Sequence, residues 1–291
     1  MKNQASSIIL LISVMIIWGS SFAVTKNSVN TIPPIFFALL RMSIASILLL
    51  IAAQFRSRTS KIPKPLPWKA FLLMGLTGTC LYYICFNNSM VYTTASVGAL
   101  IQSFIPIVTA VLAMIFLKES LSTKRLVGIA ISITGVLLII LMAAPGGRAQ
   151  NPLLGNLLML ASVFIWATYT ILAKRVAHID PIVVTAYSIA LGTLLLIPAT
   201  IVELAGKPFP VITTGSWLSA LYLGAISSGL GLLLYNRSLK HLSAGETASF
   251  LNLMPVIAVT TAVMFLGEHL TLWQVGGGAL VLTGVFFSLK K

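Results

Sequence analysis

The fold is decided by two related stretches of sequence, TTASVGALIQSFIPIVTAVLAMIFLKESL at residues 93–121 and LSAGETASFLNLMPVIAVTTAVMFLGEHL at residues 242–270. They are offset by 149 residues, and at that offset Pro106 falls on Pro255 and Glu119 falls on Glu268. Matches at a fixed offset over the length of a stretch indicate an internal repeat.

The repeat continues on both sides of these stretches. Further pairs, at offsets of 147 to 149, are Trp18 and Trp166, Lys26 and Lys174, Pro34 and Pro181, Asn87 and Asn236, Gly128 and Gly277, and Gly135 and Gly284. The near-constant offset makes chance similarity an implausible explanation, so the chain consists of two related halves.

The composition is that of a membrane protein. Of the 291 residues, 58% are hydrophobic and 8% are charged, whereas soluble domains carry roughly 25% charged residues. The net charge of +14 would suggest nucleic acid as the partner of a soluble chain. In a membrane protein the same excess fits basic residues gathered in cytoplasmic loops. We therefore expect the lipid bilayer, and no nucleic acid, as a partner.

Ten segments have the length and apolar character that a membrane-spanning helix needs, which is roughly 20 residues. They lie near residues 6–26, 34–55, 68–91, 95–117, 123–143, 153–173, 181–202, 215–236, 244–266 and 271–289. We expect an all-α integral membrane protein with ten transmembrane helices.

Loop charges predict the orientation. With a cytoplasmic N-terminus, fifteen Lys and Arg residues fall in inside regions and three fall outside. Because basic residues favour the cytoplasmic side, both termini are expected to be cytoplasmic, in a multi-pass protein of the inner (cytoplasmic) cell membrane.

The two halves are expected to have opposite orientation, because each contains five spans. The first repeat covers residues 1–143, an outside linker covers 144–152, and the second repeat covers 153–291. Inverted repeats are typical of secondary transporters, which bind substrate near the midplane where the repeats meet.

The sequence resembles EamA-type members of the drug/metabolite transporter superfamily over essentially its whole length. The resemblance rests on the 5+5 layout, WGSSFAVTK at residues 18–26, PPIFFALLRMSIA at residues 33–45, and the two stretches quoted above. It implies export of small metabolites, including amino acids, across the cytoplasmic membrane, without naming the substrate.

Polar and aromatic stripes could face a central pathway formed mainly by spans 1, 3, 4, 6, 8 and 9. They comprise Trp18, Ser21, Phe22 and Thr25; Trp166, Tyr169, Thr170 and Ala173; Thr79, Tyr82, Tyr83 and Phe86; and Ser228, Gly231, Leu232 and Tyr235. The predicted substrate-binding residues are Trp18, Ser21, Thr79, Tyr82, Tyr83, Gln102, Ser103, Trp166, Tyr169, Tyr235 and Asn252. The alternative is that these side chains serve helix packing or interfacial belts.

Three further residues within spans invite interpretation. Pro106 and Pro255 interrupt helical hydrogen bonding and are predicted hinges, with a static kink as the alternative. Arg41 is the one charge well inside a span. It is assigned a structural role, as a helix cap or by snorkelling, while binding of an anionic substrate group stays open.

Absences in the sequence narrow the mechanism. The five acidic residues fall near predicted span ends or in loops, and there is no phosphate-binding G-x-x-x-x-G-K-[ST] motif. This favours facilitated diffusion or exchange over ion coupling or ATP-driven pumping, although Glu246 leaves proton coupling open. Glu119 and Glu268 are expected to cap loops or form salt bridges.

The same absences argue against an intramembrane enzyme, a metal site or a cofactor, since one Asp and three peripheral His cannot supply a catalytic or metal-binding cluster. The predicted function is export of small metabolites by alternating access, with aromatic or other hydrophobic amino acids the best match to the stripes. A proton-coupled drug or nucleoside exporter and a small-solute channel are the alternatives. The glycines of spans five and ten serve packing or a dimer contact, in a monomer or weak homodimer.

Overall fold

The computed structural model describes residues 2–57, 66–118, 123–141 and 151–289, and in these ranges it contains helices and connecting turns but no β-strand. The first half comprises α1 (Lys2–Val29), α2 (Pro34–Ser57), α3 (Trp68–Gly75), the π-helical segment η1 (Leu76–Leu81), α4 (Tyr82–Tyr92), α5 (Ala95–Gln102), α6 (Ile105–Leu117) and α7 (Thr123–Leu141). The all-helical class expected from the sequence is confirmed for these residues.

The second half repeats this order of elements. It comprises α8 (Pro152–Arg175), α9 (Pro181–Leu204), α10 (Thr214–Leu221), the π-helical segment η2 (Tyr222–Gly231), α11 (Leu232–Leu239), α12 (Ala244–Ser249), the 3₁₀ segment η3 (Phe250–Leu253), α13 (Met254–Leu266) and α14 (Leu272–Leu289). Each element other than η3 has a counterpart in the first half.

The chain is a multi-pass membrane protein. Among the described residues, eight helical stretches are long and apolar enough to cross a bilayer. The fifth and tenth predicted spans form α7 and α14, which are not among these eight, and α7 contains a shorter apolar stretch, Ala130–Ile139.

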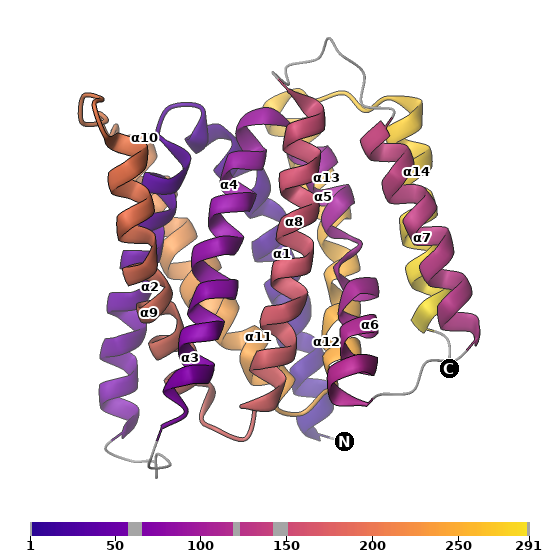
Figure 1. Ribbon diagram of the computed structural model, residues 1–291, viewed down its shortest axis with the longest axis horizontal. Helices are drawn as coiled ribbons and strands as arrows, with labels where there is room; N and C mark the ends of the chain where they lie inside the picture. Colours follow the sequence, from indigo (N-terminus) through magenta and orange to yellow (C-terminus); the bar gives the residue numbers. More distant parts are fainter. Residues whose placement is uncertain (1, 58–65, 119–122, 142–150, 290–291) are drawn as a thin grey trace.

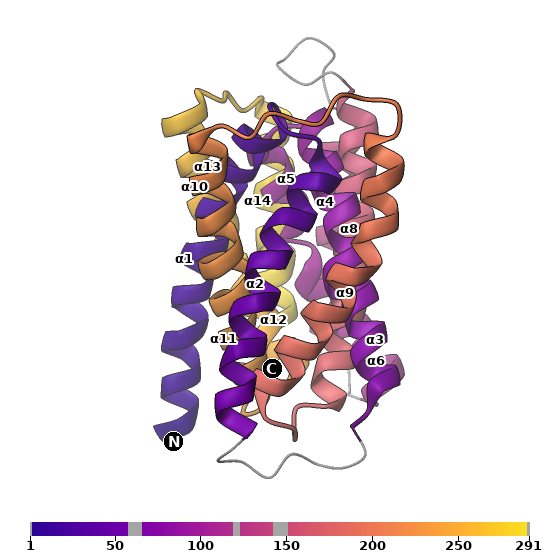
Figure 2. The ribbon, with the colours of Figure 1, turned by 90° about the vertical axis from the view of Figure 1, so that its left-hand side faces the viewer.

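The two halves run in opposite directions through the bundle. In Figure 1, α1 begins at the lower end of the bundle, whereas its counterpart α8 begins at the upper end. Both chain termini lie toward the lower end of the bundle (Figures 1 and 2). The arrangement agrees with an inverted repeat.

The third span of each half contains π-helical turns at matching places. Segment η1 falls within η2 when shifted by the repeat offset of 149 residues. The wide i→i+5 turns of a π-helix are rare and occur frequently at functional sites. Here they directly precede α4 and α11, whose first residues are Tyr82 and Leu232.

The fourth and ninth spans are broken helices, and the break precedes each proline. Helix α5 ends at Gln102, and Pro106 is the second residue of α6; likewise Pro255 is the second residue of α13. A proline is tolerated there because the N–H groups of the first helical turn have no intrahelical acceptor, so the N–H that proline lacks is not missed. Each span therefore consists of two short helices joined near its middle.

Helices α7 and α14 pack chiefly against each other through glycines. A Cβ added at Gly135 would lie 2.6 Å from the Gly277 carbonyl oxygen, and one added at Gly284 would strike the Gly128 carbonyl oxygen. Shifting the first contact by 149 residues produces the second, so the pair is symmetric between the halves. Of the two roles expected for these glycines, the structure shows packing within the fold.

Lysines cap helix ends at equivalent places. Lys26 Nζ donates to the carbonyl oxygens of Met90 and Thr93, at 2.6 and 2.9 Å, where α4 ends. Lys174 makes the same pair of bonds 149 residues along, at the end of α11, at 2.8 and 2.7 Å. Both place a cation at the negative end of a helix dipole.

Carboxylates of the second half cap helices of the first. Glu268 accepts hydrogen bonds from the N–H groups of Ala95 and Ser96, at 2.8 and 2.9 Å, at the start of α5. Glu203 does the same at the start of α2, at 3.0 and 2.7 Å. Glu268, expected to cap a loop or form a salt bridge, thus caps the start of a helix, and Glu119 lies outside the described residues.

Candidate functional site

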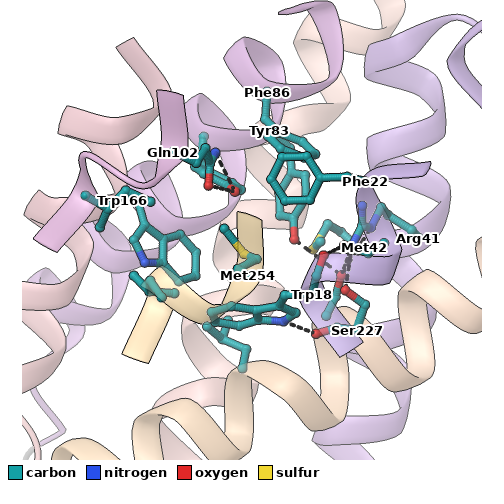
Figure 3. A pocket seen from close by; sticks show the side chains of 16 residues that line it. Trp18, Phe22, Arg41, Met42, Tyr83, Phe86, Gln102, Trp166, Ser227 and Met254 are labelled. Carbon is teal, nitrogen blue, oxygen red and sulfur yellow. Dashed lines mark hydrogen bonds between the residues drawn. The ribbon is translucent and has the colours of Figure 1, made fainter. Parts of the chain in front are cut away.

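A small cavity lies where the two halves meet (Figure 3). Its volume is about 30 Å³, which is room for about two water molecules. The lining residues are Trp18, Ser21, Phe22, Arg41, Met42, Tyr82, Tyr83, Phe86, Gln102, Ile105, Trp166, Ser227, Ser228, Leu232, Leu251 and Met254. They come from all the spans expected to form the pathway and also from α2.

One side of the cavity is an aromatic wall. Trp18 of α1 and Trp166 of α8 are in contact, with ring centroids 5.2 Å apart and planes nearly perpendicular. Tyr82 packs on Trp166 at 4.9 Å and on Tyr83 at 5.0 Å. Edge-to-face and tilted contacts at these distances are the favourable arrangements of aromatic rings.

Hydrogen bonds fix the orientation of two of these aromatic residues. The Trp18 indole N–H donates to the carbonyl oxygen of Ser227 in η2, at 2.9 Å. The Gln102 amide, which is fully buried, donates to the Tyr82 hydroxyl at 3.1 Å and to Ser162 Oγ at 3.2 Å. The wall is therefore held by polar groups of both halves.

The other side of the cavity is polar. Arg41 is buried, with 1% of its surface exposed. Its Nε donates to Ser228 Oγ at 3.1 Å, and its Nη2 donates to Ser228 Oγ at 2.9 Å and Ser227 Oγ at 3.4 Å. The guanidinium carbon lies 4.6 Å from the centroid of the Tyr83 ring, a cation–π contact. The side chain assigned a structural role thus borders the cavity.

Equivalent positions of the two halves line the cavity, with tryptophan in both members of one pair and different side chains in the other three pairs. At the repeat offset, Trp18 corresponds to Trp166, Tyr83 to Leu232, Gln102 to Leu251 and Ile105 to Met254, and all eight residues line it. The cavity therefore lies on the pseudo-symmetry axis that relates the halves.

Six of the eleven predicted binding residues border the cavity, namely Trp18, Ser21, Tyr82, Tyr83, Gln102 and Trp166. Two others, Tyr169 and Tyr235, form a second layer behind the wall, with ring centroids 5.1 and 5.7 Å from that of Trp166. The Tyr169 hydroxyl bonds to Asn236, and the Tyr235 hydroxyl bonds to Thr170.

The remaining three predicted binding residues lie elsewhere. Thr79 is buried and packs closely against Gly192 of α9. The Ser103 hydroxyl donates to the Leu100 carbonyl oxygen within its own span. Asn252 is partly exposed in η3, where its buried Oδ1 has no hydrogen-bond partner. None of the three is among the cavity-lining residues.

Six lining residues belong neither to the predicted stripes nor to the predicted binding residues, namely Arg41, Met42, Ile105, Ser227, Leu251 and Met254. The apolar ones carry no distinguishing signal, because apolar side chains face lipid, neighbouring helices and cavities alike. Ser227 could have been predicted from the sequence, because it is adjacent to Ser228, which belongs to a predicted stripe. In the described part of the chain, no group of three His, Cys, Asp or Glu residues is arranged to hold a metal ion.

Comparison with known proteins identifies a family to which both halves of this chain are similar. The model of the EamA-like transporter family matches residues 5–141 and again residues 153–290. A transporter of Bacillus subtilis named YetK, described as uncharacterized, is 30% identical, and the match covers all of this chain and 88% of that protein. A transporter of Archaeoglobus fulgidus, also described as uncharacterized, is 30% identical over 97% of this chain and 98% of its own.

Two further similarities are informative. A probable terminal-alkyne amino-acid exporter of Streptantibioticus cattleyicolor is 26% identical, with 97% of this chain and 92% of that protein covered. A chain of known crystal structure superposes on 98% of this chain and 96% of its own length, with a TM-score of 0.71 and 18% identity. At that identity the likeness concerns the fold alone.

Proposed function

Since the chain belongs to the EamA-like transporter family, we propose that it is a secondary transporter that exports small organic metabolites, above all amino acids with aromatic or other hydrophobic side chains. The observation that carries the proposal is the cavity on the pseudo-symmetry axis, with an aromatic wall on one side and polar groups on the other. Secondary transporters built from inverted repeats bind substrate at this place.

The mechanism is alternating access. The cavity of about 30 Å³ is far smaller than the roughly 300–1,000 Å³ of pockets that enclose drug-sized ligands. A metabolite enters only after the lining helices separate. Two related halves of opposite direction can exchange conformations and so open one site toward either side of the membrane in turn. The breaks before Pro106 and Pro255 are the proposed hinges.

Transport runs outward across the cytoplasmic membrane, with both termini in the cytoplasm. The charge bias of the loops supports this orientation, and both termini lie toward one end of the bundle. The amino-acid export named for the Streptantibioticus cattleyicolor relative supports the substrate class.

The energy source is the substrate gradient itself, in facilitated diffusion or exchange. None of the residues that line the cavity is Asp, Glu or His, the groups that usually carry protons in coupled carriers. Glu246, the residue that left proton coupling open, forms a capping box with Ser243 at the start of α12. That role explains its presence without coupling.

The protein acts on its substrate without changing it, as a monomer or weak homodimer that needs no cofactor. The rival class is a small-solute channel. A small, aromatic-walled cavity between inverted halves favours the carrier.

The test is flux in proteoliposomes that contain the purified protein. Labelled phenylalanine, tryptophan, leucine and glutamate are exchanged against internal unlabelled amino acid, with and without a pH gradient. We expect saturable exchange of the aromatic and hydrophobic members, independent of the gradient. Accumulation driven by the gradient would contradict uncoupled transport, non-saturating flux would indicate a channel, and absence of flux for every member would overturn the substrate class.

A further inference from the structure

Arg41 is the one charged side chain among the 16 residues that line the cavity, and it has unused hydrogen-bonding capacity. We propose that Arg41 anchors a carboxylate of the substrate, so that the cavity selects organic acids, with or without an amino group, over amines and neutral analogues. The inference rests on the proposed function, since it names the group by which the transporter recognises its substrate.

The hydrogen-bond inventory of the guanidinium group is incomplete. A guanidinium carries five N–H donors and no acceptor. Those on Nε and Nη2 are directed at the hydroxyls of Ser227 and Ser228. Nη1, which carries two of the five, is buried and has no hydrogen-bond partner. Buried donors of this kind are normally satisfied, and an exception calls for an explanation.

The charge of Arg41 is not neutralised by the groups that line the cavity. Its hydrogen-bond partners are two uncharged serine hydroxyls, and no acidic side chain is among the lining residues. A lone charge within a membrane span is costly, and such residues usually pair with an opposite charge or belong to a substrate pathway. A substrate carboxylate would supply the missing charge.

The alternative structural roles of Arg41 fit the observed contacts poorly. A helix-capping arginine would donate to backbone carbonyl oxygens, whereas each of the hydrogen bonds described for Arg41 goes to a side-chain hydroxyl. A snorkelling arginine would be exposed at its tip, whereas this residue is 1% exposed.

The internal repeat distinguishes Arg41 from the lysines that cap helix ends in both halves. At the offset of 147 residues, Arg41 corresponds to Ser188, whose hydroxyl donates to the Thr185 carbonyl oxygen at 3.2 Å. The capping lysines, by contrast, are present in both halves. The first half carries this charge and the second half lacks it, which agrees with a role in the cavity, where the two halves differ.

The surroundings of the guanidinium suit a planar anion. The guanidinium carbon lies over the Tyr83 ring, and Nη1 has no hydrogen-bond partner, so its donors are available to a carboxylate, the anion that arginine frequently binds through two parallel hydrogen bonds. The hydroxyls of Ser227 and Ser228 lie beside it as further donors. In Figure 3, Arg41 and Ser227 lie on one side of the cavity, and Gln102 and Trp166 lie on the other. An acid bound at Arg41 would therefore direct its hydrophobic part toward the aromatic wall.

The test measures binding directly, by quenching of tryptophan fluorescence and by thermal shift of the full-length protein in detergent. The probes share a phenyl group and differ at the polar end: 3-phenylpropionate, L-phenylalanine, phenethylamine and the neutral 3-phenylpropanamide. We expect the two acids to bind at least tenfold more tightly than the amine and the amide.

The variant Arg41→Gln separates recognition from a structural role. Loss of a charged hydrogen bond is expected to weaken binding of both acids by about 10- to 100-fold, with the amide unaffected and Arg41→Lys intermediate. A merely structural arginine would lower the affinity for every probe alike. Where Arg41→Gln fails to fold, the comparison of acid with amide on the native protein decides the question.

The outcomes distinguish this inference from the proposed function. Equal binding of the acid, the amide and the amine, a uniform loss in Arg41→Gln, or no binding of any probe would overturn the inference. Selective acid binding without amino-acid flux in proteoliposomes would support the role of Arg41 and overturn amino-acid transport. Flux of phenylalanine that Arg41→Gln leaves unchanged would support amino-acid transport and overturn the role of Arg41.

Discussion

The two halves of the molecule are alike at their periphery and different at the cavity. Lys26 and Lys174 cap equivalent helix ends, and the glycine contacts between α7 and α14 map onto each other. At the cavity, however, Tyr83 is matched by Leu232 and Gln102 by Leu251. The scaffold has kept its symmetry, which the proposed alternating access requires, while most of the paired side chains that line the cavity have diverged.

This difference indicates two separate demands on the repeat. Exchange of conformations needs two halves of similar shape and stability, whereas recognition of an asymmetric molecule needs unlike groups on the two sides of the cavity. Substitutions at scaffold positions should therefore have similar effects in both halves, and substitutions in the cavity should not.

The largest expected effect is at the glycines where each third span crosses a second span. A Cβ at Gly75 would lie 2.6 Å from the backbone of Gly192, and a Cβ at Gly224 would lie 2.7 Å from the carbonyl oxygen of Arg41. Because backbone atoms cannot give way, Gly75→Val and Gly224→Val should each destabilise by about 3 kcal/mol or more. Size-exclusion yield and thermal melting in detergent would measure this.

The matched control for that pair is Gly276→Val, at a position with open space around the added side chain. It should leave yield and melting temperature essentially unchanged. A large loss in one half and none in the other would show that the two crossings are not equivalent.

The next effect concerns the aromatic wall. Trp166→Ala and Tyr82→Ala remove rings that pack on each other at 4.9 Å, and we expect transport per folded molecule to fall at least tenfold while membrane insertion is retained. Trp273→Ala, at an exposed position on α14, is the control. Normal flux in both wall variants would contradict the proposed lining.

A smaller effect is expected at the lysine caps. Lys26→Met and Lys174→Met each remove two charged hydrogen bonds to helix ends, at a cost of about 2 kcal/mol. The loss should be somewhat larger for Lys26, which is buried, than for Lys174, which is partly exposed. Thermal melting of the two variants side by side measures the difference. An unchanged melting temperature in either variant would contradict the prediction that both lysine caps stabilise the protein.

The smallest effect should come from Tyr235→Phe. The hydroxyl bonds to Thr170 at 3.1 Å, behind the wall rather than in the cavity, so its loss should cost about 1 kcal/mol of stability. Flux should stay within about twofold of the native value, because the ring remains. A tenfold fall in flux would place Tyr235 in the binding site after all.

Much of the helical framework follows from sequence patterns. The predicted span at 68–91 compares with a helical stretch from Trp68 to Tyr92, and the one at 153–173 with α8 at Pro152–Arg175. The length of an apolar run and the prolines that begin helices are local signals. The π-helical turns of η1 and η2 are not, because nothing in LTGTCL distinguishes a wide turn from an ordinary one.

The candidate site was predictable where residue type is informative. Trp and Tyr at helical spacing indicated the aromatic wall, since large polar-tipped rings are conspicuous among aliphatic side chains. Arg41 was visible, but its setting was not, because Ser227 and Ser228 lie far away in sequence and reach it only through the packing of α2 against η2. Apolar lining residues such as Leu251 could be recognised only in three dimensions.

The pairing of α7 with α14 also bears on how the chain is made. The main partner of α7 is α14, which begins only at Leu272, and at roughly 5–20 residues per second that partner follows on the order of ten seconds later. Until then the face of α7 that packs against α14 lacks its main protein partner. Closure of the bundle therefore waits for α14, and a chain that stops short of α14 would keep an open face by which quality control can recognise it.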